Sequence, residues 1–225
     1  MTAEQSPPLT RRESGKAQRR RRIVEAAAAL VRESDFDAVS MVQIAERAGL
    51  SPATLYNQFQ TKAAIFREVF DRDLEDFEQR LARARTRDAL DRIFVAIELA
   101  AGQSRRDPEF YRAMARVGGH GANGLATAIR APRVTFWQSL AADAVAQGCL
   151  RPDTDAERLG LTLQRFMRGI FLEWAAGSIP ARRLAEDSAY AFALMLLPHA
   201  SAAAAPALAA RIGPRRRAAA LRSAH

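Results

Sequence analysis

Residues 40–61, SMVQIAERAGLSPATLYNQFQT, constrain the fold most, because they predict two short helices, a tight turn between them and the start of a third. Ser40 and Gln43 have the spacing of a capping box, in which the serine hydroxyl accepts from the first turn and the glutamine reaches back to the serine N–H. Gly49 can adopt the positive φ that ends a helix. One short helix is therefore predicted from about Met41 to the residue before this glycine.

The second short helix begins after Ser51, which is placed as its cap, and runs from Pro52 to about Tyr56 or Gln58. Leu55 and Phe59 fall on one face of it and are predicted to be buried. The other face carries hydroxyls, an amide and small apolar groups, a mixture that suits the major groove of DNA. That face consists of Pro52, Ala53, Thr54, Tyr56 and Asn57. An ordinary helical hairpin within a protein core is the alternative interpretation.

A longer segment, residues 22–70, resembles the TetR family of bacterial transcriptional regulators. The resemblance is carried by RIVEAAAALV, by Phe36, and by IAERAGLSPATLYNQF and TKAAIFREVF. Its most specific part is the pattern TLY-x-x-F-x-x-K over residues 54–62. Family members usually have glycine where Asp35 stands, and the aspartate is expected to adopt the same left-handed conformation at some cost.

The resemblance implies an all-α fold, in which an N-terminal three-helix helix-turn-helix domain binds DNA and a C-terminal helical bundle binds a ligand and dimerises. The periodicity agrees, because no stretch has the period of two that is typical of strands. Helices are predicted at about 17–34, from 62 onward, and at 88–102, 107–117, 124–148, 155–176 and 184–198, with a flexible glycine-rich connection at 117–124 that contains His120.

Four segments follow from this interpretation. They are a disordered N-terminal arm at 1–16, the helix-turn-helix DNA-binding domain at 17–61, the effector-binding and dimerisation domain at 62–200, and an Ala/Arg-rich tail at 201–225. Disorder or a frayed helix is expected for the tail, because it lies outside the usual extent of the family.

Charge and composition limit the classes of partner. The formal net charge is +9, with 10 Lys+Arg against 7 Asp+Glu in residues 1–62, and five arginines without an acid in residues 199–225. This basic excess favours a polyanionic partner, although a solvated basic tail is the alternative at each end. No run approaches the roughly 20 apolar residues of a membrane span, and no signal-peptide core is present, so a cytoplasmic protein without membrane contact is expected.

The residue types for common active sites are missing or scattered. Cys149 is the single cysteine, and the three histidines lie far apart along the chain, so no disulfide, metal site or cofactor is predicted. An all-helical enzyme is one alternative, but no Ser-His-Asp order, metal-ligand spacing or phosphate loop is present, and no catalytic residue is expected. A non-specific, nucleoid-type DNA binder is the other; it predicts equal affinity for random and operator duplexes, whereas a regulator predicts a large ratio.

The resemblance also implies a division of roles among the DNA contacts. Thr54, Tyr56 and Lys62 would bind phosphates, and a basic arm, which residues 19–22 would provide here, would reach phosphates or a minor groove. Gln43 and Asn57 would read a base edge, with adenine the geometric favourite, and the first turn of the second helix would touch a thymine methyl. The predicted DNA-binding residues are Gln43, Ser51, Pro52, Ala53, Thr54, Tyr56, Asn57, Lys62, Arg21 and Arg22.

The implied mechanism is that of a homodimeric repressor on a pseudo-palindromic double-stranded DNA operator, released when an apolar or aromatic small-molecule effector changes the spacing of the two reading helices. Side chains that suit its pocket, or else an ordinary core, are Phe94, Phe110, Tyr111, Met114, Phe136, Trp137, Phe166 and Met167. The predicted dimer surface on the last two long helices consists of Phe171, Trp174, Tyr190, Leu194 and Leu197.

Overall fold

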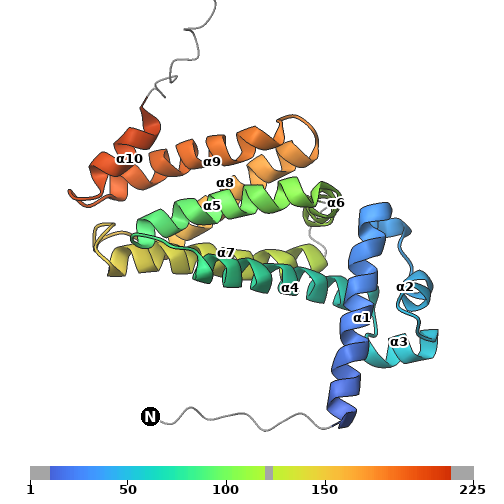
Figure 1. Ribbon diagram of the computed structural model, residues 1–225. Helices are drawn as coiled ribbons and strands as arrows, with labels where there is room; N and C mark the ends of the chain where they lie inside the picture. Colours follow the sequence, from blue (N-terminus) through green and yellow to red (C-terminus); the bar gives the residue numbers. More distant parts are fainter. Residues whose placement is uncertain (1–10, 120–123, 214–225) are drawn as a thin grey trace, which may run out of the picture. The chain divides into compact units, whose positions relative to one another are not determined.

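The computed structural model describes residues 11–119 and 124–213, and its regular structure is helical (Figure 1). These two ranges contain ten α-helices, two short 3-10 helices and no strand, so the predicted all-α class is confirmed. The predicted loop histidine, His120, lies outside the described residues.

The chain divides by packing into two compact units. Unit 1 comprises residues 1–80 and 103–133, and unit 2 comprises residues 81–102 and 134–225. The division falls within three helices, which are α4 (Lys62–Arg83), α5 (Ala89–Arg106) and α7 (Gly124–Ala146). The functional boundaries expected at residues 61 and 200 stay a prediction.

Unit 1 is built around the first helix, α1 (Arg11–Glu33), which packs on α2 (Met41–Arg47) and on α6 (Pro108–Gly119). The short η1 (Phe36–Ala38) and the helix α3 (Pro52–Gln58) complete the N-terminal part. The apolar stripe predicted for α1 is buried, and it consists of Ile23, Ala26, Ala27, Leu30 and Val31. Burial of this stripe drives the packing of α1, because apolar area removed from water contributes roughly 25 cal/mol per Å².

A bidentate ion pair holds α6 against α1. The Arg32 guanidinium donates to both carboxylate oxygens of Asp107, with Nη2 2.7 Å from Oδ2 and Nε 3.1 Å from Oδ1. The same guanidinium lies 5.1 Å from the ring centroid of Phe110, which packs against Phe70 of α4. Three helices of unit 1 therefore meet around one aromatic side chain.

The start of α1 differs from the prediction of a disordered arm at residues 1–16. The helix begins at Arg11, so residues 11–16 are helical, whereas residues 1–10 lie outside the described part of the chain. Two features of the sequence explain the extension. No proline follows Pro8 before the end of α1, and Glu13 stands in the first turn, where its charge favours the positive end of the helix dipole.

The conformation predicted for Asp35 is wrong. Asp35 is extended, with φ −67° and ψ 147°, and no residue other than glycine has a positive φ in the described ranges. Its carboxylate instead forms an ion pair with Arg116 of α6, with Oδ1 3.0 Å from Nε. The chain thus leaves α1 through an extended residue and forms η1, where the half-buried Phe36 packs edge-on against Phe66.

Unit 2 contains the two long helices α8 (Ala156–Ala175) and α9 (Ala181–Leu196), which pack on each other, together with parts of α5 and α7. The crossing of α7 and α8 is close at Gly160, where an added Cβ would stand 2.4 Å from the Cα of Gln138. Trp137 and Phe192 meet edge-on in the core, with ring centroids 5.1 Å apart. Gly160 is required at the crossing, because the backbones of α7 and α8 approach too closely there for a side chain.

The predicted disorder or fraying of the tail is wrong for residues 205–212, which form the helix α10 (Ala205–Ile212) against α9. Leu208 is completely buried, and the Arg211 guanidinium lies 3.8 Å from the ring centroid of Phe94. These two contacts explain the order, because an isolated eight-residue helix is marginal unless it packs. Residues 214–225 lie outside the described ranges.

Candidate nucleic-acid interface

The two helices α2 and α3 have the local geometry that their sequence predicts. The capping box is formed, with Ser40 N donating to Gln43 Oε1 at 2.8 Å and Gln43 N donating to Ser40 Oγ at 3.2 Å. Gly49 has φ +63°, and the N–H of Leu50 donates to the carbonyl of Ala45 at 2.9 Å, which closes the end of α2. The turn is therefore fixed by backbone chemistry that few other residues could replace.

The N-terminus of α3 is capped by Ser51, whose Oγ accepts from Thr54 N at 3.2 Å, and Pro52 stands in the first turn. Leu55 and Phe59 are buried as predicted. Because these two side chains anchor one face, the opposite face of α3 is directed to solvent.

The predicted reading face is exposed as a group. Pro52, Ala53, Tyr56 and Asn57 are all exposed, and half of the Tyr56 side chain is accessible (50%). Thr54 is half-buried, and its hydroxyl lies 2.9 Å from the hydroxyl of the capping Ser51.

Gln43 of α2 is also exposed, but the capping box occupies its amide oxygen. Its amide nitrogen is left as the group that can reach a base edge. Val42, which is 48% exposed, was not predicted as a contact. The sequence does indicate that Val42 is exposed, because it falls outside the apolar spacing of Met41, Ile44 and Ala45.

Two arginines of α1 cap the C-terminal ends of α2 and α3. Arg22 Nη2 donates to the carbonyls of Ala48 and Gly49 at the end of α2, the latter at 3.2 Å. Arg20 donates to the carbonyl of Gln58, the last residue of α3, at 3.4 Å, and also pairs with Glu68. A cation at a helix C-terminus is favourable, because the last carbonyls carry partial negative charge.

Because Nη2 of Arg22 is directed to carbonyls within the protein, the predicted phosphate contact of Arg22, which stays a prediction, would have to use its other donors. Arg21, also in the predicted set, is exposed and pairs with Glu25 one turn later, with Nε 2.7 Å from Oε1. The carboxylate Glu25 raises the pKa of Arg21, by hydrogen bonding first and by its charge second.

Lys62 is also turned toward the protein. Its Nζ donates to the carbonyl of Phe36 at 2.8 Å and approaches that of Asp37 at 3.4 Å, and it lies 4.3 Å from the ring centroid of Phe36. The lysine therefore attaches the start of α4 to η1. A phosphate contact would require it to leave these partners or to use its third donor.

The predicted effector-pocket residues are distributed over both units. Phe110, Tyr111 and Met114 are buried in unit 1, whereas Phe94, Phe136 and Trp137 are buried in unit 2. The two remaining residues of unit 2, Phe166 and Met167, are half-buried.

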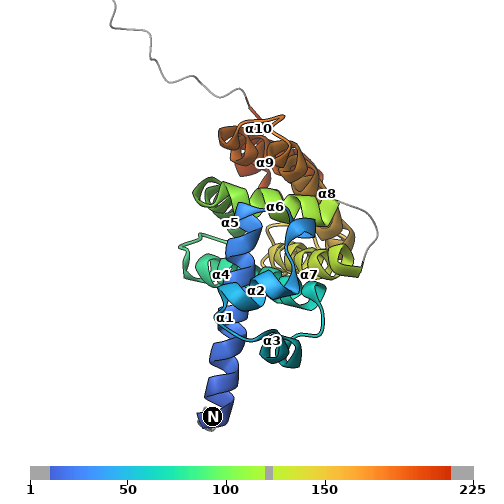
Figure 2. The same cartoon turned by 90° about the vertical axis from the view of Figure 1, so that its right-hand side faces the viewer.

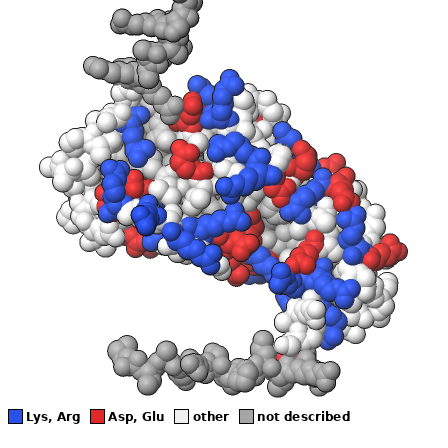
Figure 3. All heavy atoms as spheres, viewed as in Figure 1, with Lys and Arg blue, Asp and Glu red and all other residues white. Residues whose placement is uncertain are grey.

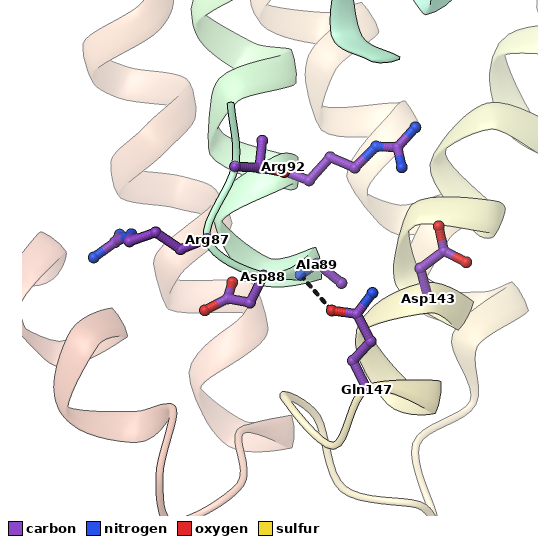
Figure 4. Close-up of a pocket in the computed structure, with 7 residues that line it drawn as sticks. Arg87, Asp88, Ala89, Arg92, Asp143 and Gln147 are labelled. Atoms are coloured by element: carbon purple, nitrogen blue, oxygen red, sulfur yellow. Dashed lines mark hydrogen bonds between the residues drawn. The ribbon is translucent and has the colours of Figure 1, made fainter. Parts of the chain in front are cut away.

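The cavity in Figure 4 is polar and contains none of these residues. It has a volume of about 180 Å³ and lies where α5 begins and α7 ends. Ala89 N donates to Gln147 Oε1 across it at 2.9 Å. It is lined by Thr86, Arg87, Asp88, Ala89, Arg92, Asp143 and Gln147.

The predicted dimer surface is partly available on unit 2. Tyr190 (49%) and Leu194 (44%) of α9 are exposed, and Phe171 and Leu197 are half-buried. Trp174 is buried and packs on Phe171, with ring centroids 5.3 Å apart, so it belongs to the core of the protomer rather than to its surface.

No group of three or more His, Cys, Asp or Glu side chains in the described ranges could hold a metal ion. None of the helices described is both long and apolar enough to cross a membrane.

Comparison with known proteins identifies relatives of the DNA-reading segment and of the whole fold. Residues 23–69 match the model of the tetR family of bacterial regulatory proteins. The HTH-type transcriptional repressor KstR of Rhodococcus jostii (strain RHA1) is 31% identical over 99 residues, which are 44% of this chain and 47% of KstR. The matched segment therefore spans about half of that relative.

Solved structures extend the similarity over most of the chain. FadR of Thermus thermophilus, a TetR family transcriptional repressor solved with lauroyl-CoA, is 26% identical, with a TM-score of 0.66 over 79% of this chain and 93% of FadR. The TetR regulator TylP of Streptomyces fradiae is 25% identical, with a TM-score of 0.62 over 92% of this chain and 95% of TylP. Together with the exposed face of α3 and its capped turn, these similarities show that residues 23–69 match the DNA-binding segment of the tetR family and that the chain shares the fold of TetR family transcriptional regulators.

Proposed function

We propose that this chain is a transcriptional repressor that binds a pseudo-palindromic DNA operator as a homodimer and leaves it when a small molecule binds. The observation that carries the proposal is the exposed face of α3, formed by Pro52, Ala53, Tyr56 and Asn57, on a helix anchored by buried Leu55 and Phe59. A rigid helix with polar and small side chains on its free face fits the major groove. Such a protein acts on chromosomal DNA, so we place it in the cytoplasm.

The base contacts that we propose come from two amides and from the first turn of α3. Asn57 can pair with an adenine by accepting through its amide oxygen and donating through its amide nitrogen, and Gln43 can donate through its free nitrogen. Pro52 and Ala53 suit a thymine methyl. Tyr56 and Thr54 are proposed to bind phosphates, which set the position of the helix without reading sequence.

Dimerisation is proposed through α9 and the adjoining face of α8. Tyr190, Leu194 and Leu197 follow the spacing i, i+4, i+7 along one side of the chain that includes α9, and two of them are exposed. Exposed large apolar side chains grouped on one helix face are typical of an interface. Leu194→Lys should therefore halve the mass measured by light scattering at micromolar concentration, whereas Glu98→Lys, on the exposed side of α5, should not.

The effector is proposed to be an amphiphile with an apolar chain, of the class of fatty acyl thioesters. Support comes from the FadR complex with lauroyl-CoA, and from the aromatic cluster around Phe192 of unit 2, with Trp137 at 5.1 Å and Phe166 at 6.2 Å between ring centroids. Lauroyl-CoA is the probe, and it should release the DNA complex in proportion to its concentration. Failure of this compound would remove the effector class and leave the DNA-binding function standing.

Selection from a random-sequence DNA pool, followed by fluorescence anisotropy, tests the function. The protein should enrich one palindromic sequence and bind it about 10³-fold or more tightly than a random duplex. Asn57→Ala should weaken binding to the enriched duplex by about 1–3 kcal/mol and barely change binding to the random duplex. Glu98→Gln, in the other unit, is the matched control. Equal affinities for enriched and random duplexes would reject a regulator and favour the non-specific DNA binder.

A further inference from the structure

The polar cavity between the start of α5 and the end of α7 is used neither by the proposed DNA contacts nor by the proposed effector cluster. All seven of its lining residues belong to unit 2. Its volume of about 180 Å³ is roughly six times the 30 Å³ that one water molecule occupies in the liquid. Pockets for drug-sized ligands are larger, at about 300–1,000 Å³. The cavity therefore suits a molecule of about six non-hydrogen atoms.

Arg92 of α5 brings to this cavity a donor that no described residue accepts. The residue is half-buried, and its Nε is closed to solvent and has no hydrogen-bond partner in residues 11–119 or 124–213. No described carboxylate forms an ion pair with its guanidinium. A buried donor without an acceptor is unfavourable, so an acceptor from another molecule would stabilise it. Because the guanidinium presents its donors in a planar fork, a carboxylate is an acceptor that matches it.

The acids at the start of α5 already have other partners. Oδ1 of Asp91 lies 3.0 Å from Nη2 of Arg87 and 3.9 Å from Nη2 of Arg211. Arg211 belongs to α10, which packs against α9 in both views of the chain (Figures 1 and 2). Oδ1 of Asp88 accepts from the N–H of Asp91 at 2.7 Å and caps the helix. These contacts leave the charge of Arg92 without a partner on its own helix.

Asp143 of α7 supplies the opposite charge on the other wall of the cavity. Its side chain is exposed and forms no ion pair or hydrogen bond with any part of the chain that the structure describes. Figure 4 shows the Arg92 side chain extending toward α7, and the Asp143 carboxylate directed to the side on which that guanidinium lies. Gln147 adds a donor, because the N–H of Ala89 occupies its Oε1 and leaves its Nε2 free. One cation and one carboxylate, each without a described partner, therefore border the same cavity.

We infer that the cavity binds a small zwitterion, a free α-amino acid, with its carboxylate on Arg92 and its ammonium on Asp143. The lining charges select this class, because an anion alone would be repelled by Asp88 and Asp143 and a cation alone by Arg92. The face drawn in Figure 3 adds no strong preference for one sign of charge, since acidic side chains lie between its basic ones. The inference goes beyond the proposed function, because no lining residue belongs to α3 or to the aromatic cluster around Phe192.

Titration of the whole chain with L-alanine, followed by ¹H–¹⁵N NMR, tests the inference. The reporter is the backbone N–H signal of Ala89, which lines the cavity and donates across it. This signal should shift along a saturable curve, with a dissociation constant in the millimolar range, because the ligand is small and one of its ion pairs is exposed. Asp143→Asn should weaken the affinity about fivefold, the ratio that an exposed ion pair contributes. Arg92→Gln should weaken it about tenfold or more, because hydrogen bonds of a charged donor are lost.

A matched variant separates the site from a general effect of charge. Asp153→Asn removes the same charge from an exposed loop of unit 2 outside the cavity, and it should leave the affinity unchanged. The Asp143 side chain has no described partner to lose, so its variant should keep the circular dichroism spectrum of the wild type. A shift of the Ala89 signal that never saturates, or that is equal in wild type and Asp143→Asn, would overturn the inference.

Two further probes test the class of ligand. Acetate and methylammonium each carry one of the two charges, and both should bind more weakly than L-alanine. If either ion binds as tightly as L-alanine, the cavity is a site for a single charge and the zwitterion is rejected. Selection of an enriched duplex does not depend on any of these outcomes, so failure of the amino-acid site leaves the proposed function standing.

Discussion

The hydroxyl of Tyr111 donates a hydrogen bond of 2.5 Å to Oδ1 of Asp73, and the other carboxylate oxygen lies 3.3 Å from Nη2 of Arg133. This polar cluster joins α4, α6 and α7 inside unit 1. Burial raises the pKa of Asp73, although the charge of Arg133 and the Tyr111 hydrogen bond act in the other direction. Burial likewise lowers the pKa of Arg133 and raises that of Tyr111.

The raised pKa of Asp73 predicts a pH dependence of folding with a definite sign. The carboxyl has a pKa of about 3.9 in an unfolded chain, so the native state retains its proton to higher pH than the unfolded state does. Its contribution to the free energy of unfolding therefore falls as pH rises from that value through the native pKa. Urea unfolding of wild type and Asp73→Asn across this window should give a difference, wild type minus variant, that decreases with pH. A difference that increases would mean that the attraction of Arg133 outweighs burial.

Arg22 is expected to matter for stability although its neighbour Arg21 is not. Arg22→Gln removes the charged donor to the carbonyls of Ala48 and Gly49, and hydrogen bonds of charged groups contribute about 1.5–3 kcal/mol. Arg21→Gln removes an exposed pair with Glu25, for which no measurable change in unfolding is expected. Thermal unfolding of the two variants, which carry the same substitution at adjacent positions, is the comparison. Equal losses would show that the cap at the end of α2 contributes nothing.

The glycines of α8 provide a second matched pair. A Cβ at Gly160 would stand 2.4 Å from Cα and 2.6 Å from N of Gln138, so the two backbones would have to separate. Gly160→Ala should cost about 1–3 kcal/mol by overpacking, observed as a lower urea midpoint. Gly169 of the same helix has no atom within 4 Å of its added Cβ, and Gly169→Ala should stabilise by roughly 0.5–1 kcal/mol. Loss of stability in both variants would mean that helix geometry rather than the crossing is responsible.

The features that could be predicted are those that depend on neighbours in sequence. The capping box of Ser40, the positive φ of Gly49 and the cap at Ser51 each involve residues within one turn, so the helix boundaries around the turn are confirmed. Leu55 and Phe59 follow from helical spacing in the same way. The exposed face of α3 is then a direct consequence of its buried face.

The roles of the arginines and of the tail depend on distant neighbours. Nothing local distinguishes Arg22, which caps α2 across 26 residues of sequence, from Arg21, which pairs within its own helix. The extended conformation of Asp35 depends on Arg116, which is far along the chain. The order of α10 likewise depends on a pocket for Leu208 and on Phe94 under Arg211. The periodicity of one segment carries no information about these distant partners, so the sequence could not predict the contacts.

The variant Lys62→Met distinguishes a structural role of this lysine from a role in DNA binding. Lys62→Met keeps an apolar stem over Phe36 and removes the amine that donates to the carbonyls of Phe36 and Asp37. The free energy of unfolding should fall by about 1.5–3 kcal/mol, because a charged donor is lost from a half-buried carbonyl. The slope of log K for DNA binding against log salt should stay at the wild-type value, because the amine donates to carbonyls within the protein. If Lys62→Met lowers the slope and leaves unfolding unchanged, the lysine exchanges its carbonyl partners for phosphate when DNA binds.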